Sequence, residues 1–158
     1  MPGDPFLAFP PRPTDLAEWE ELLVRLELGP RALRFAMDDI DRPSAAVLEP
    51  LNRLVAMELW TARALDTMRR GGGAVPEKIG ISHVDPADAA AGARKRLEEY
   101  VALRTDNFAA LQRRGIQVWE WSAELEGGGT VTAYQVVRRA LQIDGEVLRA
   151  VRAAGHEE

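Results

Sequence analysis

Hydrophobic residues recur at helical spacing along most of the chain. In the first such stretch they step by alternating fours and threes, with Pro30 in the missing position: Trp19, Leu23, Leu26, Leu33, Met37 and Ile40. This pattern is typical of a helix that buries one face in a bundle. Asp15, with Glu18 three residues on, is a capping signal for its start. We expect a first helix from Asp15 that bends or breaks at Gly29-Pro30, because proline removes an intrahelical hydrogen bond.

A second helical stretch follows Ser44 and ends at about Met68. Pro50 is tolerated only in the first turn, which puts the predicted start at about Val47. The inward positions are Val47, Leu51, Leu54, Leu65 and Met68. The glycine-rich connection of residues 71–83 is long, which indicates a crossover or a loose loop rather than a tight hairpin.

A third helix is predicted to open at Asp85-Pro86, a capping residue followed by proline at the first helical position, and to stop at Gly115. Its inward positions are Ala93, Leu97, Tyr100, Val101, Phe108 and Leu111. Residues 116–121 then alternate apolar and polar at strand period. This segment is short and isolated, so we expect an extended piece that covers a bundle edge, with its two tryptophans packed on the bundle rather than exposed for docking.

The last helix has the clearest start signal. Thr132 and Gln135 form a capping box, in which each side chain bonds the other residue's amide. No proline interrupts residues 136–154, so a long final helix follows. The three glycines at 127–129 lack the lysine and the serine or threonine of a phosphate loop, which favours a hinge over an anion cradle. The sequence therefore predicts an all-α fold, a four-helix bundle with a long connection between helices two and three.

Length and composition fit one globular domain. The chain has 158 residues, enough to bury a core, and no cysteine, which excludes disulfides and thiolate zinc sites. No apolar run approaches the roughly 20 residues of a membrane span, and the start does not resemble a signal peptide, so we expect a cytoplasmic location. We divide the chain into an extended, proline-rich lead-in whose Phe6, Leu7 and Phe9 can lie on the domain (1–14), the bundle (15–154) and a tail (155–158).

Basic residues cluster in short runs: Arg69-Arg70, Arg94-Lys95-Arg96, Arg113-Arg114 and Arg138-Arg139. Such runs are compatible with a nucleic-acid surface, or with solvated helix faces and helix C-termini whose dipoles attract cations. The net charge is −5, with 20 basic and 25 acidic residues, so a basic excess is missing. We therefore predict no nucleic-acid partner.

Over residues 15–154 the helix pattern resembles the DinB/YfiT-like bundle proteins. The resemblance rests on residues 29–33 (Gly-Pro-Arg-Ala-Leu), 47–58, the Gly-Thr-Val-Thr segment at 129–132, and 136–148. Members commonly bind a divalent metal through one histidine on helix two and two on helix four. The resemblance implies a homodimer, stress-induced expression, and activities such as thiol S-transfer, thiol-dependent isomerisation or metal-dependent hydrolysis.

The metal ligands of that family do not survive in this chain. The corresponding positions are Arg53, Ile143 and Val147, and none of these side chains ligates a cation. The two histidines, His83 in a loop beside Ser82 and His156 near the end, cannot replace them. We therefore expect no metal, cofactor or catalytic residue, and a protein that acts by binding a small molecule or a partner. The alternative is a small-molecule enzyme, a thiol S-transferase or hydrolase, with a non-histidine pocket.

Three polar residues keep the register of the apolar stripes. Glu58 lies in phase on helix two, Arg104 on helix three and Asp144 on helix four. Either each sits at the edge of its stripe and reaches water, or the three form a polar layer inside the bundle. In a layer the two carboxylates would repel or share a proton unless Arg104 or Arg53 lies between them. We predict a ligand-binding site formed by Arg53, Glu58, Arg104 and Asp144.

Overall fold

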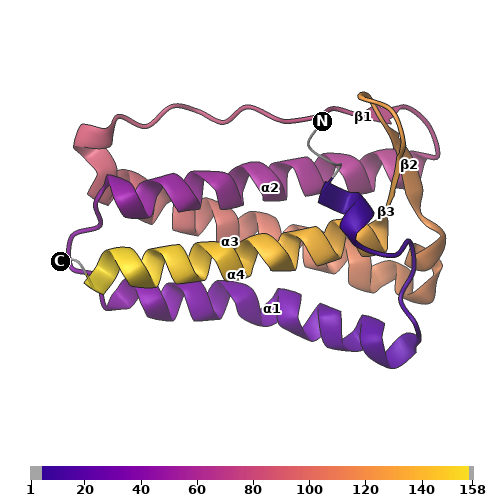
Figure 1. The fold of residues 1–158 in the computed structure, drawn as a ribbon, viewed down its shortest axis with the longest axis horizontal. Coiled ribbons are helices and arrows are strands. Elements are labelled where there is room, and N and C mark those ends of the chain that lie inside the picture. The colour runs from indigo at the N-terminus through magenta and orange to yellow at the C-terminus, as the bar shows by residue number, and fades with distance from the viewer. Residues whose placement is uncertain (1–4, 157–158) are drawn as a thin grey trace.

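The computed structural model describes residues 5–156, and four long helices dominate it (Figure 1). They are α1 (Leu16–Asp38), α2 (Ala45–Arg70), α3 (Ala89–Arg114) and α4 (Ala133–His156). In Figure 1, α1 and α4 run in one direction, and α2 and α3 run in the opposite one. The predicted bundle of four helices is therefore confirmed, and two of its neighbouring pairs are parallel.

Helix starts follow the capping signals in the sequence. The Asp15 side chain accepts a hydrogen bond from the Glu18 backbone N–H at 2.8 Å, so α1 begins where predicted. At α4, the Gln135 N–H donates to the Thr132 hydroxyl at 3.2 Å, and the Thr132 N–H donates to Gln135 Oε1 at 3.0 Å. This reciprocal pair is the predicted capping box.

Pro30 and Pro50 both lie inside helices. α1 continues through Pro30 as one element, so the expectation of a possible break there is wrong. α2 begins at Ala45, two residues before the predicted Val47, and Pro50 therefore lies beyond the first turn. A helix tolerates such a proline at the cost of one backbone hydrogen bond, here the one to the carbonyl four residues earlier.

The connection between α2 and α3 crosses the length of the bundle, as Figure 1 shows, so the crossover alternative is the right one. Trp60 Nε1 donates to the Pro76 carbonyl at 2.7 Å near its start. Near its end, the Arg96 guanidinium donates to the Ser82 carbonyl and hydroxyl. Arg96 is only 1% exposed, so the solvated helix face expected for the basic run 94–96 is wrong at this residue.

A small sheet covers one end of the bundle, which the sequence reading did not expect. β2 (Ser122–Leu125) pairs in parallel with β1 (Ala74–Val75) and antiparallel with β3 (Thr130–Thr132). Val75 of β1 and Val131 of β3 are fully buried in the core, which ties the sheet to the bundle. The glycines at 127–129 form the hairpin turn rather than a hinge, and Gly128 and Gly129 have positive φ angles of 99° and 84°.

The segment predicted to be extended is instead a 3-10 helix, Gly115–Glu120. Val118 of this helix is in the core, and both Trp119 and Trp121 pack against it, as predicted for the two tryptophans. The lead-in also holds a 3-10 turn, Pro5–Ala8, from which Phe6 stacks on Trp60 with ring centroids 5.0 Å apart. No helix among residues 5–156 is long and apolar enough to cross a membrane.

The ends of the chain depart from the expected division in two details. Leu7 is 73% exposed, so it does not lie on the domain as Phe6 does. α4 continues to His156, two residues into the predicted tail.

Candidate functional site

The three in-register polar residues meet at the centre of the bundle. Arg104 of α3 lies between two carboxylates: its Nε is 2.7 Å from Glu58 Oε1 of α2, and its Nη2 is 2.8 Å from Asp144 Oδ1 of α4. Glu58 is 1% exposed and Arg104 is 2% exposed. The alternative in which each residue reaches water is therefore wrong for these two, and the polar layer exists. We call Glu58, Arg104 and Asp144 the charged layer.

α1 contributes a backbone carbonyl to the charged layer, and it does so because of Pro30. Proline has no N–H, so the Leu26 carbonyl, four residues earlier, lacks its helical partner. Arg104 Nη1 donates to this oxygen at 3.0 Å. We interpreted Pro30 in the sequence only as a kink. A proline in a helix, however, frees the carbonyl four residues earlier, and that rule identifies Leu26.

Gly29 allows α1 to approach this closely. A Cβ atom at this position would lie 2.7 Å from Asp144 Oδ2 and 3.1 Å from Arg104 Nη1. The Gly29-Pro30 pair therefore shapes the site, the glycine by leaving space and the proline by freeing an acceptor.

Two further residues of α3 join the charged layer. The Tyr100 hydroxyl donates to Asp144 Oδ1 at 2.9 Å, and Asn107 Nδ2 donates to the Glu58 carbonyl at 3.0 Å. We predicted from the sequence that Tyr100 points inward, without a role in the site, and we made no prediction for Asn107. Both lie within one helical turn of Arg104 on the same face, and that spacing was the available signal.

The layer contains two carboxyl groups but only one cation. All five guanidinium N–H groups of Arg104 have acceptors, which is what a buried arginine requires. Burial by itself lowers the pKa of Arg104, but Glu58 and Asp144 outweigh it and raise that pKa, so the arginine stays charged. Burial raises the pKa of Tyr100 well above its usual value, so this phenol stays a neutral donor. Two carboxyl groups thus share one cation, which leaves the layer with an excess of negative charge when both are ionised.

A cavity of about 250 Å³ between α1 and α4 reaches the charged layer. Asp144 and Tyr100 line it, and the Asp144 side chain keeps 13% of its surface exposed. Apolar side chains form most of the remaining wall: Leu28, Ala32, Leu33, Leu54, Leu141 and Leu148. The cavity therefore joins an apolar lining to one carboxylate, with the exposed Arg25 also among its lining residues.

The fourth predicted site residue, Arg53, is not part of the charged layer. Its guanidinium pairs with Glu146 of α4 at 2.7 Å, and its side chain is 48% exposed. Ile143 and Val147, the other two positions that the resemblance assigns to metal ligands, are buried at 4% and 1% exposure. In the part of the chain that the structure describes, no group of three or more histidine, cysteine, aspartate or glutamate residues is arranged to hold a metal ion.

Comparison of the chain with protein-family models, with curated proteins and with solved structures finds no significant match. The function is therefore argued from the charged layer and the cavities themselves.

Proposed function

We propose that this protein is a DinB/YfiT-like bundle that binds a small organic molecule, without the family's metal, in the cavity between α1 and α4. One observation carries the proposal: the wall of an apolar cavity contains Asp144, a member of a buried layer with more carboxylates than cations. Buried charges are costly, and a group of them that borders a ligand-sized cavity is typical of a functional site.

The chemistry of the cavity indicates the ligand class. Asp144 favours a cationic or hydrogen-bond-donating group, which would offset the excess negative charge of the layer. The leucine-rich wall favours an apolar body next to that group. At about 250 Å³ the cavity lies just below the usual range for drug-sized ligands, so a small amine with a single ring or a short chain is the best fit.

A matched series of three probes tests this ligand class. Benzylamine, benzyl alcohol and benzoate share a ring and differ in charge, and isothermal titration calorimetry measures their affinities. We expect the order amine, alcohol, benzoate, because Asp144 attracts the first, accepts a hydrogen bond from the second and repels the third. Equal affinities, or the reverse order, would contradict the proposal.

Two tryptophan substitutions on α1 test the location. Ala32→Trp fills the cavity without removing a charged group, whereas Ala17→Trp adds the same side chain at an exposed position outside it. We expect Ala32→Trp to abolish amine binding and Ala17→Trp to leave it unchanged. Binding that survives Ala32→Trp would place the ligand elsewhere.

The enzyme alternative depends on a catalytic group that no observation yet identifies, so binding is the function we propose. Thermal melts with and without zinc, nickel and manganese test the metal-free part: a rise in melting temperature at stoichiometric metal would overturn it. Stress-related expression and a cytoplasmic location stay predictions from the sequence.

The homodimer also stays a prediction of the resemblance. α1 exposes Val24, Leu28 and Phe35, which share one stripe of the helix and would suit contact with a second copy. Sedimentation equilibrium should give twice the chain mass for the wild type and the single mass for Phe35→Asp. A monomeric wild type would refute the dimer.

A further inference from the structure

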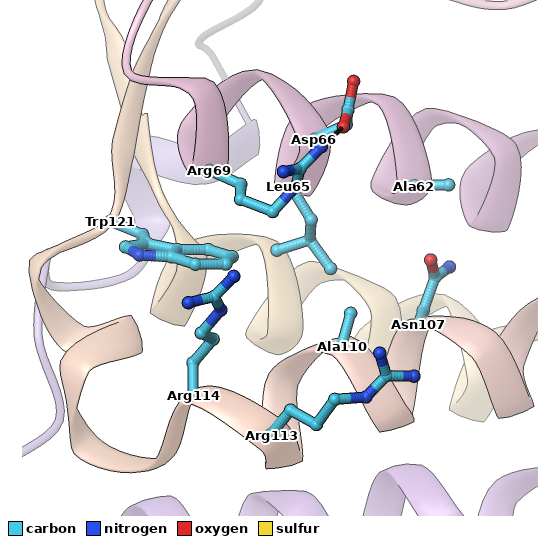
Figure 2. Close-up of a pocket in the computed structure, with 9 residues that line it drawn as sticks. All are labelled: Ala62, Leu65, Asp66, Arg69, Asn107, Ala110, Arg113, Arg114 and Trp121. Carbon is cyan, nitrogen blue, oxygen red and sulfur yellow. Dashed lines mark hydrogen bonds and ion pairs between the residues drawn. The ribbon is translucent and has the colours of Figure 1, made fainter.

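A second and larger cavity, of about 510 Å³, lies between the C-terminal halves of α2 and α3 (Figure 2). The two helices run parallel, so their last turns lie at the same end of the molecule, and each ends in Arg-Arg-Gly. Ala62, Leu65 and Ala110 give the cavity an apolar lining. Its volume falls within the range of about 300–1,000 Å³ that is typical of small-ligand sites.

The cavity carries positive charge on an otherwise acidic protein. Arg69 lines it but is neutralised by Asp66, whose carboxylate lies 2.8 Å away. Arg113 and Arg114 also line it, both are exposed, and neither forms a hydrogen bond or ion pair within residues 5–156. Two unpaired guanidinium groups therefore face a cavity in a chain whose net charge is −5.

A buried amide and an aromatic ring complete the lining. Asn107 is 5% exposed, and its Nδ2 donates to the Glu58 carbonyl, which leaves Oδ1 without a donor among the described residues. Trp121 is half-buried and forms another wall. In Figure 2 the Arg114 guanidinium points toward the Trp121 ring, and the Arg113 guanidinium extends to the same side as Asn107.

The helix dipoles give a simpler reason for some of these arginines, since cations stabilise helix C-termini. Arg70 fits that reason fully, because it lies outside the cavity and pairs with Asp66 at 3.0 Å. A dipole does not, however, require an aromatic wall or a buried asparagine next to the cations. We propose that this cavity binds a small planar organic anion, with its ring against Trp121 and its phosphate or carboxylate group between Arg113 and Arg114.

Calorimetric titration with a naphthalene series tests this second site. The probes are 2-naphthyl phosphate, 2-naphthoate, neutral 2-naphthol and inorganic phosphate. We expect at least one aromatic anion to bind about tenfold or more tightly than either naphthol or phosphate alone, because ring and charge are recognised together. The rank of phosphate against carboxylate then identifies the anionic group. Inorganic phosphate that binds as tightly as the aromatic anions would overturn the proposal.

Matched arginine variants separate ligand binding from helix stabilisation. Arg113→Gln and Arg114→Gln should each weaken the aromatic anion about tenfold, whereas Arg70→Gln should leave its affinity unchanged. If the arginines only compensate the helix dipoles, all three variants will lower the melting temperature alike and none will change the affinity. Arg113→Lys and Arg114→Lys keep the charge, and partial binding by them supports the bidentate geometry.

The indole NMR signals of the tryptophans test whether the ligand contacts Trp121. In a nitrogen–proton correlation spectrum, the indole signal assigned to Trp121 by a Trp121→Phe variant should shift on titration, and the signals of Trp19 and Trp60 should not.

Ala32→Trp, which fills the first cavity, should leave this binding intact, so failure of the proposed amine site and failure of this site are distinguishable. A single-stranded oligonucleotide that binds more tightly than any naphthalene probe would refute the small-molecule assignment in favour of nucleic acid.

Discussion

Two arginines of α3, Arg96 and Arg104, are buried almost equally, at 1% and 2% exposure, but their partners differ. Arg96 donates to neutral oxygens of Asn52 and Ser82, and to the carboxylate of Glu99, which keeps 32% exposure. Arg104 donates to two carboxylates from other helices and to a carbonyl of α1. The first therefore attaches a connecting segment to the bundle, and the second joins all four helices.

The difference shows why only one of the two is proposed as part of a site. The acceptors of Arg96 balance its charge locally, since Glu99 lies on the same helix and reaches water. The acceptors of Arg104 carry one negative charge too many when both are ionised, and the cavity at Asp144 opens onto them. Burial alone is thus weak evidence for function, and the excess of carboxyl groups over cations next to a cavity is the informative feature.

The largest expected effect is that of Arg104→Met. It removes the cation between Glu58 and Asp144, and breaking a buried charge pair in this way costs about 3–5 kcal/mol. Urea unfolding monitored by circular dichroism measures the loss. A loss below about 1 kcal/mol, typical of an exposed pair, would mean that the charged layer is hydrated in solution.

Arg96→Met should cost less, about 1–3 kcal/mol, because two of the acceptors it leaves are neutral and the one carboxylate it unpairs, Glu99, reaches water. Its effect should also be local. Hydrogen exchange is expected to accelerate in residues 71–85, which Arg96 holds, and to change little in α4. Uniform acceleration across the bundle would instead give Arg96 the same role as Arg104.

The sequence predicted Arg104 and missed Arg96, and the reason lies in their neighbours along the chain. Arg104 lies in an apolar stripe, and two other stripes carry Glu58 and Asp144 in register, so periodicity offered a polar layer of the three as one of two alternatives. Arg96 lies in a basic run, Arg94-Lys95-Arg96, that reads as a solvated surface. Its burial depends on the crossover segment, whose path no local pattern specifies.

The same limit explains the other misses. β1 has two residues and pairs with β2 from a distant part of the chain, so no local signal specified the sheet. The Leu26 carbonyl is part of the site because Pro30 leaves it without a helical donor, and we had interpreted Pro30 only as a bend. In contrast, the capping box at Thr132 was predicted correctly because both of its partners lie within one helical turn.

Thr132→Ala should cost about 1 kcal/mol, through loss of the hydroxyl that caps α4. This effect is smaller than that of either buried arginine, because the substitution removes a single hydrogen bond between two uncharged groups. A change indistinguishable from zero in urea unfolding would mean that the start of α4 does not depend on this bond.

The last effect appears as a pH dependence and comes from the partly buried cluster of Glu18, Tyr134 and Arg138. Hydrogen bonds from the Thr14 hydroxyl, then from Tyr134 and the Thr14 N–H, lower the pKa of Glu18 from 4.5 to about 2. A lowered pKa in the folded state adds stability above the unfolded value, and this stability is lost as the pH falls from about 4.5 to about 2. The wild type should therefore lose more stability than Glu18→Gln across this window. Parallel loss in both proteins would contradict the low pKa.

Replacement of the whole charged layer tests the central claim, that the layer is kept for binding rather than for folding. The variant Glu58→Met, Arg104→Met, Asp144→Leu exchanges three charges for apolar groups of similar size, and such exchanges are often neutral or stabilising. Calorimetry with benzylamine, on a variant shown to be folded by circular dichroism, is the direct measurement. We predict a folded protein, about as stable as the wild type, that no longer binds the amine. A folded variant that binds benzylamine as tightly as the wild type would contradict the account.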